Sequence, residues 1–529
     1  MKTIKFLGMA ALALVGAIMT GCSSDDDVVN NQQPENNAEI LTTTVSLSPD
    51  TRALTANGVK TFAEGDKMAV MYRNTNDEGV KAVSYELTAS DISNDGKSAT
   101  FTVKLYSPDK TKGVSYIYPA AMATDNGNVN YDKLAEQDGT LASLASELDC
   151  SYAAATSWDG ANLPALELQN QFAILAFTLK NSDGSSEITS GITGMTVNDG
   201  KNTYNVSRTP APGPIYLAIR PTGADPVHVM VTATQGSNVY LKSLTNKSYT
   251  VGNGYNLSLR MMVPVKGEFT INANASGNKV YFSPGNLQAT TTDYGAHWKW
   301  HFAPTPWNYV GNDAANKNIN GNGTVSANGT VDLFGWSTAA TIYGINNSNA
   351  AADYSGDFVD WGATIGEGWR TLTKDEWNYV FNSRNSGSTV LGTSNARYAF
   401  AIINYDGYPT RGIILFPDNI NIVTGDVTKG NVNDATVAFK DAIKCTPEQW
   451  FNLTLKGCVF LPASGFRSVT NISYVASKGY YWSSTDYDTN IDYYVAFTIP
   501  TANDQSTLSF VSHYNRSYGC AVRLVRPVQ

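Results

Sequence analysis

The stretch GEGWRTLTKDEW, residues 366–377, decides how the second half of the chain folds. It contains the pattern Thr373-x-x-Glu376, which predicts a capping box at the start of a helix. In such a box the threonine hydroxyl accepts from the backbone N–H of the glutamate, whose carboxylate accepts from the N–H of the threonine. Trp377, Val380 and Phe381 follow at i, i+3 and i+4, so we expect the helix to bury one face.

A second helix start lies at residues 446–449. Thr446 is the expected N-cap, Pro447 occupies the first helical position, and Gln449 is the reciprocal cap. Strand patterns surround both helices, as at residues 412–417 and 459–462. The sequence therefore predicts an α+β domain over residues 267–529.

Tryptophan usage marks the boundary of this domain. Of ten tryptophans only Trp158 precedes residue 263. Because a jump in tryptophan density indicates a different core, we place a linker at residues 263–266.

The preceding region, residues 41–262, reads as short strands separated by turn residues. Residues 68–72 form an apolar run, and residues 99–105 alternate between apolar and polar side chains. Residues 172–177 are apolar on both faces and should lie centrally between two sheets. This region is therefore expected to be mainly β, with one or two β-sandwiches.

The N-terminal residues predict that the protein is located at the cell surface. Lys2 and Lys5 precede an apolar run that is too short to span a bilayer, so residues 1–21 read as a signal peptide. Residues 19–22 resemble a lipobox, in which Cys22 receives a diacylglycerol and fatty acids such as palmitate; the alternative is an ordinary signal peptide with a chance cysteine. The acidic residues 23–27 resemble a surface-export signal or are a solvated linker. Residues 22–40 are polar and predict a disordered tether, so the lipid is the expected outer-membrane anchor.

Composition excludes several classes of function. The net charge is −9 and no Lys/Arg cluster is present, so no nucleic-acid partner is expected. With four histidines and no HExxH or Cys-x-x-Cys motif, a zinc site is not predicted. The pairing among the four remaining cysteines stays open: Cys150, Cys445, Cys458 and Cys520.

The first region resembles the fimbrillin family, the pilus subunits assembled from surface lipoproteins. The resemblance rests on the order of five segments: residues 45–52, 61–68, 116–120, 166–179 and 254–257. It implies that a protease cuts between Arg52 and Ala53, behind the first strand, and that another pilin subunit then fills the groove with its own strand. Such an exchange is physically sensible because a missing strand exposes sheet edges and an apolar slot. The alternative is that Arg52 is an ordinary loop arginine.

The second region resembles bacterial surface domains related to the C-type lectin-like and formylglycine-generating-enzyme superfamily. The matching segments are residues 281–287, 333–336, 368–377, 460–465, 481–485 and 521–525. The enzymes of that superfamily use a closely spaced cysteine pair late in the domain. Here Cys458 and Cys520 lie far apart in sequence and Cys445 stands alone, so we expect a binding domain and not an enzyme.

The expected ligand is a carbohydrate or a protein on a host or bacterial surface. Exposed aromatic rings stack on sugars, and the candidate contacts are Trp307, Tyr487 and Tyr493, which flank loops. Trp369, Trp377, Trp450 and Trp482 are expected in the core, and Arg370 and Arg523 are expected to be structural.

No cofactor is expected, although one loop has some features of a calcium-binding loop. Its oxygen-bearing side chains alternate as in calcium loops: Asp486, Asp488, Asn490 and Asp492. The glycine and glutamate that complete such loops are missing, because Ile491 and Phe497 stand at those positions. An ordinary solvated Asp-rich turn is the favoured interpretation.

Together these patterns predict a lipid-anchored cell-surface protein that acts as a fimbrial subunit with a C-terminal lectin-like adhesin domain. Because residues 525–529 follow the last expected strand without a further strand to donate, a tip or minor subunit is expected. The alternative is a stand-alone glycan-binding lipoprotein of a nutrient-uptake system, which would show no processing at Arg52.

Overall fold

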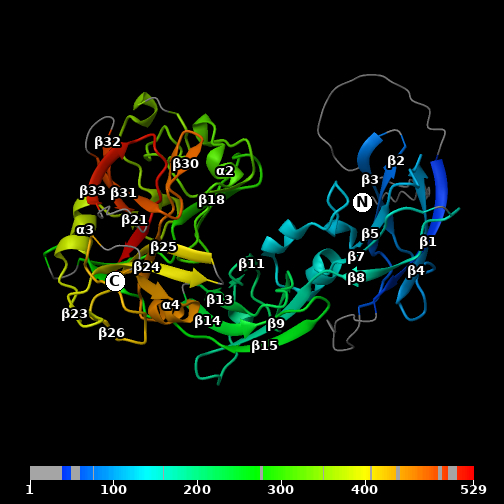
Figure 1. Ribbon diagram of the computed structural model, residues 1–529, viewed down its shortest axis with the longest axis horizontal. Helices are drawn as coiled ribbons and strands as arrows, with labels where there is room; N and C mark the ends of the chain where they lie inside the picture. The colour runs from blue at the N-terminus through cyan, green and yellow to red at the C-terminus, as the bar shows by residue number, and fades with distance from the viewer. Residues whose placement is uncertain are drawn as a thin grey trace, which may run out of the picture.

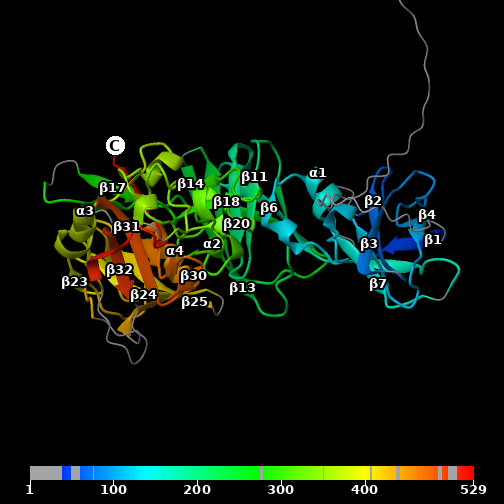
Figure 2. The same cartoon turned by 90° about the horizontal axis from the view of Figure 1, so that it is seen from above.

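The computed structural model describes residues 38–48, 60–75, 77–158, 160–236, 238–274, 278–348, 351–405, 408–436, 441–486, 491–498 and 509–528. They form three bodies along the long axis of the molecule (Figures 1 and 2). A large sheet lies at one end, a sandwich occupies the middle, and the tryptophan-rich domain lies at the other end. The mainly β fold predicted for residues 41–262 is confirmed by the strands of the first two bodies, and the third body combines strands with short helices, as the α+β prediction expects.

The first body is a seven-stranded sheet with the order β3-β2-β5-β7-β8-β1-β4. Its strands are β1 (Ala38–Leu47), β2 (Lys67–Asn74), β3 (Asp77–Glu86), β4 (Ser98–Tyr106), β5 (Val114–Tyr118), β7 (Ser151–Ala155) and β8 (Leu166–Asn170). The alternation predicted for residues 99–105 is confirmed, since Ala99, Phe101, Val103 and Leu105 are buried and the residues between them are exposed. Because β1 begins at Ala38, the last residues of the predicted tether belong to a strand.

Strand β2 is buried on both faces. Met68 and Val70 belong to the core of the first sheet, whereas Ala69 and Met71 belong to the core of the middle sandwich. This dual burial explains why residues 68–72 form a continuous apolar run instead of an alternating pattern.

The middle body packs a five-stranded sheet, β14-β13-β10-β11-β6, against a three-stranded sheet, β12-β9-β15. Its strands are β6 (Glu136–Gln137), β9 (Ala173–Lys180), β10 (Gly194–Asn198), β11 (Thr203–Ser207), β12 (Ile215–Ile219), β13 (Val227–Gln235), β14 (Asn238–Lys247) and β15 (Gly254–Arg260). A short helix, α1 (Leu141–Ser143), lies beside it. Strand β9 is the central strand of its sheet and lies in this core, as its apolar sequence predicts.

Over its described residues, the third body contains several small sheets and three α-helices, besides short 3-10 and π helices. Its first strands are β16 (Glu268–Thr270), β17 (Lys279–Phe282), β18 (Leu287–Thr291), β19 (Lys299–Phe302), β20 (Gly329–Val331), β21 (Arg370–Thr371), β22 (Thr389–Val390), β23 (Thr393–Ser394), β24 (Tyr398–Tyr405) and β25 (Tyr408–Leu415). They continue as β26 (Asn421–Ile422), β27 (Ile443–Cys445), β28 (Val459–Pro462), β29 (Phe466–Ser468), β30 (Asn471–Ser473), β31 (Lys478–Asp486), β32 (Ile491–Thr498), β33 (Ser509–Asn515) and β34 (Leu524–Pro527). Strand β34 pairs with β17, so the beginning and the end of this body lie side by side.

Its helices are α2 (Ala314–Lys317), α3 (Lys374–Asn378) and α4 (Pro447–Leu455). Both predicted capping boxes are confirmed, at Thr373 with Glu376 and at Thr446 with Gln449. The Thr373 hydroxyl accepts from the Glu376 N–H at 3.2 Å, and the Glu376 carboxylate accepts from the Thr373 N–H at 2.8 Å.

The predicted core tryptophans are largely confirmed. Trp377, Trp450 and Trp482 are buried, whereas Trp369 is only half-buried. Trp377 begins the buried face of α3 and contacts Phe282 and Tyr481, at centroid distances of 5.6 and 6.5 Å. The helix therefore ties β17 to β31 through one ring.

The middle body and the tryptophan-rich domain share a hydrophobic cluster. Met230 on β13 and Leu241 on β14 pack with residues of the third body that include Trp307, Trp450 and Phe460. Figure 1 accordingly shows the β13–β14 hairpin beside α4 and β25. Around the link, Leu241 exchanges backbone hydrogen bonds with Met262, and the Val265 N–H donates to Leu455. The two bodies therefore meet through an apolar contact as well as a covalent link.

None of the helices in the described ranges is both long enough and apolar enough to cross a bilayer.

Candidate functional site

Strand β1 is an interior strand of the first sheet, although it is the first described element of the chain. It pairs antiparallel with β4 from Ala38 to Ser46 and parallel with β8 from Val45 to Leu47. Its inward residues Leu41, Thr43, Val45 and Leu47 are all at most 5% exposed. Without β1, both neighbouring strands would present unpaired backbone groups, and the sheet would contain an apolar slot.

The slot has one polar position. The Thr43 hydroxyl lies 3.1 Å from both the Tyr116 hydroxyl and the Pro164 carbonyl, and the Tyr116 hydroxyl donates to that carbonyl at 2.9 Å. Burial raises the pKa of Tyr116 to about 12, so the phenol stays protonated and remains a donor. The hydrogen bonds among Thr43, Tyr116 and Pro164 therefore fix the position of β1 in the core.

The chain enters the body again at Lys60, which is buried. Its ammonium group donates to the Asp149 carbonyl and lies 3.6 Å from the Asp149 carboxylate and 3.0 Å from the Ser151 hydroxyl. It also stands 4.7 Å from the ring centroid of Tyr118. Because a buried charge is stable only when it is paired and hydrogen-bonded, Lys60 fixes the chain on the far side of residues 49–59.

The predicted processing and lipidation residues lie outside the described residues. Arg52 and Ala53 fall between β1 and Lys60, and Cys22 lies before Ala38. The structure thus describes both ends of the segment that contains Arg52, and the cut itself stays a prediction.

The sequence-based interpretation of Trp307 is wrong, because its side chain is 8% exposed. It packs in the hydrophobic cluster that the tryptophan-rich domain shares with β13 and β14. Its ring is therefore not an open stacking surface for a sugar. Tyr487 lies outside the described residues, and only the backbone of Tyr493, on β32, is described.

The candidate calcium loop is described only in part. Asp486 accepts a hydrogen bond from the buried guanidinium of Arg516, so the charge of its carboxylate is already paired within the protein. Asp488 and Asn490 lie outside the described residues, and for Asp492 only the backbone is described. Over the described ranges no group of three or more His, Cys, Asp and Glu side chains is arranged to hold a metal. The favoured interpretation as a solvated Asp-rich turn and its calcium alternative both stay untested.

Arg370 and Arg523 have structural roles, as predicted. Arg370 donates two hydrogen bonds to the Glu376 carboxylate, at 2.7 and 2.8 Å, so the capping residue also holds β21. Arg523 is buried and donates to the Asn286 side chain at 3.2 Å and to the Pro284 carbonyl at 3.3 Å.

All four described cysteines are buried free thiols. Burial raises the pKa of Cys445 to about 12 and raises the pKa of Cys458 and Cys520 further. Reactive cysteines need a stabilised thiolate and access to solvent, and Cys445, Cys458 and Cys520 have neither.

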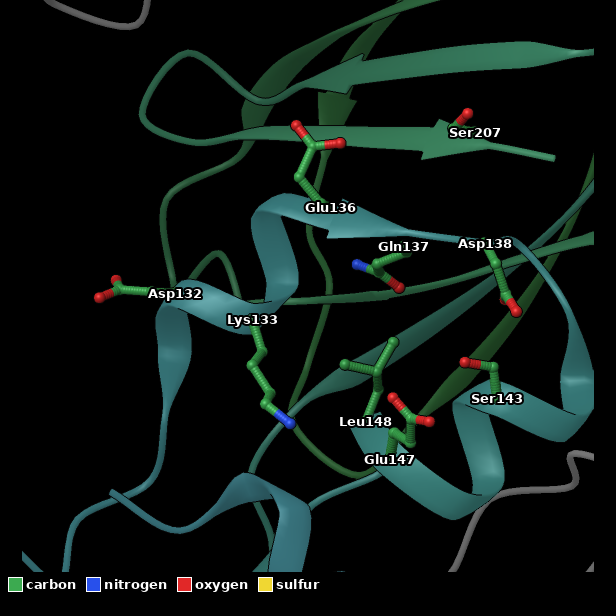
Figure 3. A pocket seen from close by; sticks show the side chains of 9 residues that line it. All are labelled: Asp132, Lys133, Glu136, Gln137, Asp138, Ser143, Glu147, Leu148 and Ser207. Carbon is green, nitrogen blue, oxygen red and sulfur yellow. The ribbon is translucent and has the colours of Figure 1, made fainter. Parts of the chain in front are cut away.

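An open hollow of about 500 Å³ lies between β6, the turn after α1 and the end of β11 (Figure 3). Its lining is rich in acidic side chains, among them Asp132, Glu136, Asp138 and Glu147. The Glu136 carboxylate accepts from Asn205 at 2.9 Å, and Gln137 exchanges two hydrogen bonds with the backbone of Ala218. These bonds hold β6 to its neighbours, so the lining serves the packing of the sandwich.

Sequence reasoning missed a cluster of five aromatic rings in the tryptophan-rich domain. It consists of Phe466, Tyr474, Tyr480, Tyr514 and Tyr518. No local sequence pattern predicts this cluster, because the rings come from different strands and turns and meet only in the folded domain.

Comparisons with known proteins find matches only among solved structures. No protein-family model matches the chain, and no curated protein matches it. Among solved structures, a fimbrial assembly protein from Parabacteroides distasonis is 10% identical; the match covers 46% of this chain and 94% of that protein, with a TM-score of 0.26. A fimbrial protein from Bacteroides ovatus is 12% identical over 92% of this chain and 99% of that protein, with a TM-score of 0.23. Likenesses at these scores carry no functional argument, so the argument below depends on the residues of this chain.

Proposed function

We propose that this protein is a lipid-anchored subunit of a surface fimbrium, in which β1 is removed and replaced by a strand from a neighbouring subunit. The observation that carries the proposal is the place of β1, an interior strand joined to the rest of the fold by residues 49–59. A cut after Arg52 would sever β1 from the fold. Lys60, through its contact with Asp149, would keep the remaining body closed at that point.

The groove left by β1 would accept a strand by β-augmentation. Its backbone partners are β4 on one side and β8 on the other, and its side-chain pockets are those of Leu41, Thr43, Val45 and Leu47. Because successive side chains of a strand point to opposite faces, a donor with apolar or small residues at alternate positions fits these pockets.

The proposal assigns adhesion to the tryptophan-rich domain, as a lectin-like module for a carbohydrate or a surface protein. The pairing of β17 with β34 supports this assignment, because it joins the two ends of the domain and leaves the intervening loops for recognition. The buried, protonated thiols support a binding role over a redox enzyme. Anchoring through Cys22 and a place at the fibre tip belong to the same proposal.

Limited proteolysis of the native chain tests the processing step. A trypsin-like protease is expected to produce one new N-terminus at Ala53, and the Arg52→Gln variant should resist the cut. The cut chain should then capture a labelled peptide with the sequence of residues 38–48, whereas the same peptide with Val45→Asp should not be retained. A folded chain that is cut at Arg52 but binds neither peptide would contradict strand exchange.

The location proposals have separate tests. Metabolic labelling with a fatty acid should mark the wild-type protein and not Cys22→Ala. Immunogold labelling should mark fibre ends; labelling along the shaft would contradict the tip position.

A further inference from the structure

A cluster of five aromatic rings forms one continuous surface between β29, β30, β31 and β33. Phe466 lies at its centre, with ring centroids 5.1 Å from Tyr480, 5.3 Å from Tyr518, 5.7 Å from Tyr514 and 5.9 Å from Tyr474. Phe466 and Tyr480 are buried and form the floor. Tyr514 and Tyr518 are half-buried, and Tyr474 is 50% exposed.

Tyr474 is held in its exposed position by the backbone. Its φ of 60° lies in the left-handed region, which is unfavourable for a bulky side chain. Its carbonyl accepts from the N–H groups of Ser477 and Lys478, at 3.0 and 2.9 Å, and from the Ser477 hydroxyl at 3.0 Å. The surrounding fold therefore maintains an arrangement that leaves half of a large ring in solvent.

The hydroxyl of Tyr474 forms no hydrogen bond to the described part of the chain, so it is available to a ligand. The ring lies parallel to that of Phe466, with an interplanar angle of 22°. The Tyr474 ring is half-exposed and carries a polar tip, and such a ring can contact the apolar face and the hydroxyls of a sugar.

A cationic side chain lies at this surface. The Lys478 ammonium stands 4.4 Å from the Tyr474 ring centroid, and no carboxylate of the described residues pairs with it.

We propose that Tyr474 and Lys478, supported by Phe466, form a binding site for an acidic carbohydrate, with the sugar ring on Tyr474 and its carboxylate at Lys478. This inference names a ligand class for the adhesin domain of the proposed function and depends on that function for its biological setting. A neutral sugar would use the aromatic ring alone, whereas an acidic sugar also pairs with the ammonium group.

A glycan array that carries uronate- and sialate-bearing oligosaccharides beside neutral ones tests the site with the intact chain. Binding to acidic glycans is expected, and calorimetry then compares the strongest ligand with its carboxyl-reduced, neutral form. Tyr474→Ala should weaken binding about tenfold, and Tyr474→Phe should retain most of it. Lys478→Gln should weaken binding of the acidic ligand and leave binding of the reduced ligand unchanged. Added salt should likewise weaken binding of the acidic ligand only.

Tyr294→Ala is the matched control, because Tyr294 is 59% exposed and has a φ of 56° but has no lysine over its ring among the described residues. Its affinity should equal that of the wild type. The proposal is overturned if no acidic glycan binds, if the reduced ligand binds equally well, or if Tyr474→Ala and Lys478→Gln bind like the wild type. These assays need no second subunit, so a failure of strand exchange leaves them unaffected, and their failure leaves the peptide-capture test intact.

Discussion

Replacing Trp377 by alanine is expected to produce a large loss of stability confined to the tryptophan-rich domain. The ring is fully buried and packs against Phe282, Phe381 and Tyr481. Removing a buried tryptophan from such a core costs about 3–5 kcal/mol, since transfer and cavity terms add. For a domain of this size the loss lowers Tm by roughly 10 °C.

Two variants calibrate this prediction. Trp377→Phe keeps most ring contacts and removes an indole N–H that has no acceptor among the described residues, so its cost should stay below about 2 kcal/mol. Trp369→Ala removes a half-buried ring that contacts Phe302 and the Arg526 guanidinium, and about 1–2 kcal/mol is expected.

The measurement is chemical denaturation followed by near- and far-ultraviolet circular dichroism, since the remaining tryptophans make fluorescence difficult to interpret. A cost for Trp377→Ala below about 1 kcal/mol, or one equal to that of Trp369→Ala, would refute the reasoning that α3 anchors the core through this ring.

Four further predictions concern a helix cap, the contact between bodies and two buried titratable groups. Thr446→Ala should cost about 1 kcal/mol in denaturant unfolding because the N-cap bond to Gln449 is lost, and Thr446→Ser should restore it. Leu241→Asp should split a single calorimetric transition into two, because an unpaired carboxylate would enter the cluster between the bodies; an unchanged single transition would contradict this role. Burial lowers the pKa of His228 to about 4, so its contribution to stability should fall as pH falls from about 6.5 to 4, and His228→Gln should remove that slope. Burial raises the pKa of Asp332 to about 7, so the contribution of its carboxyl should fall as pH rises from about 4 to 7, and thermal melts of Asp332→Asn should show a flatter dependence over that range.

Local features of the fold could be predicted from the sequence because their causes are local. The capping boxes at Thr373 and Thr446 depend on residues three positions apart, and both occur as expected. The alternation of residues 98–106 likewise predicts a strand with one wet face. Neither pattern contains information about which strands become neighbours.

Long-range packing was the part that the sequence did not reveal. A tryptophan beside a loop, such as Trp307, resembles a binding residue until Met230 and Leu241 from another body cover it. The aromatic surface around Phe466 is a similar case, since its rings are dispersed along the chain and are brought together by β29, β31 and β33. Strand β1 was predictable as a strand, but its interior position depends on β4 and β8.

The β13–β14 hairpin has a mechanical consequence. Val229 and Val231 point into the core of the middle sandwich, while Met230 and Leu241 point into the cluster with the tryptophan-rich domain. Close-packed interiors transmit strain, so tension applied to the tryptophan-rich domain would pass through this two-sided hairpin into the sandwich. The packed contact would then share the load, and the short link at residues 263–266 would carry only part of it.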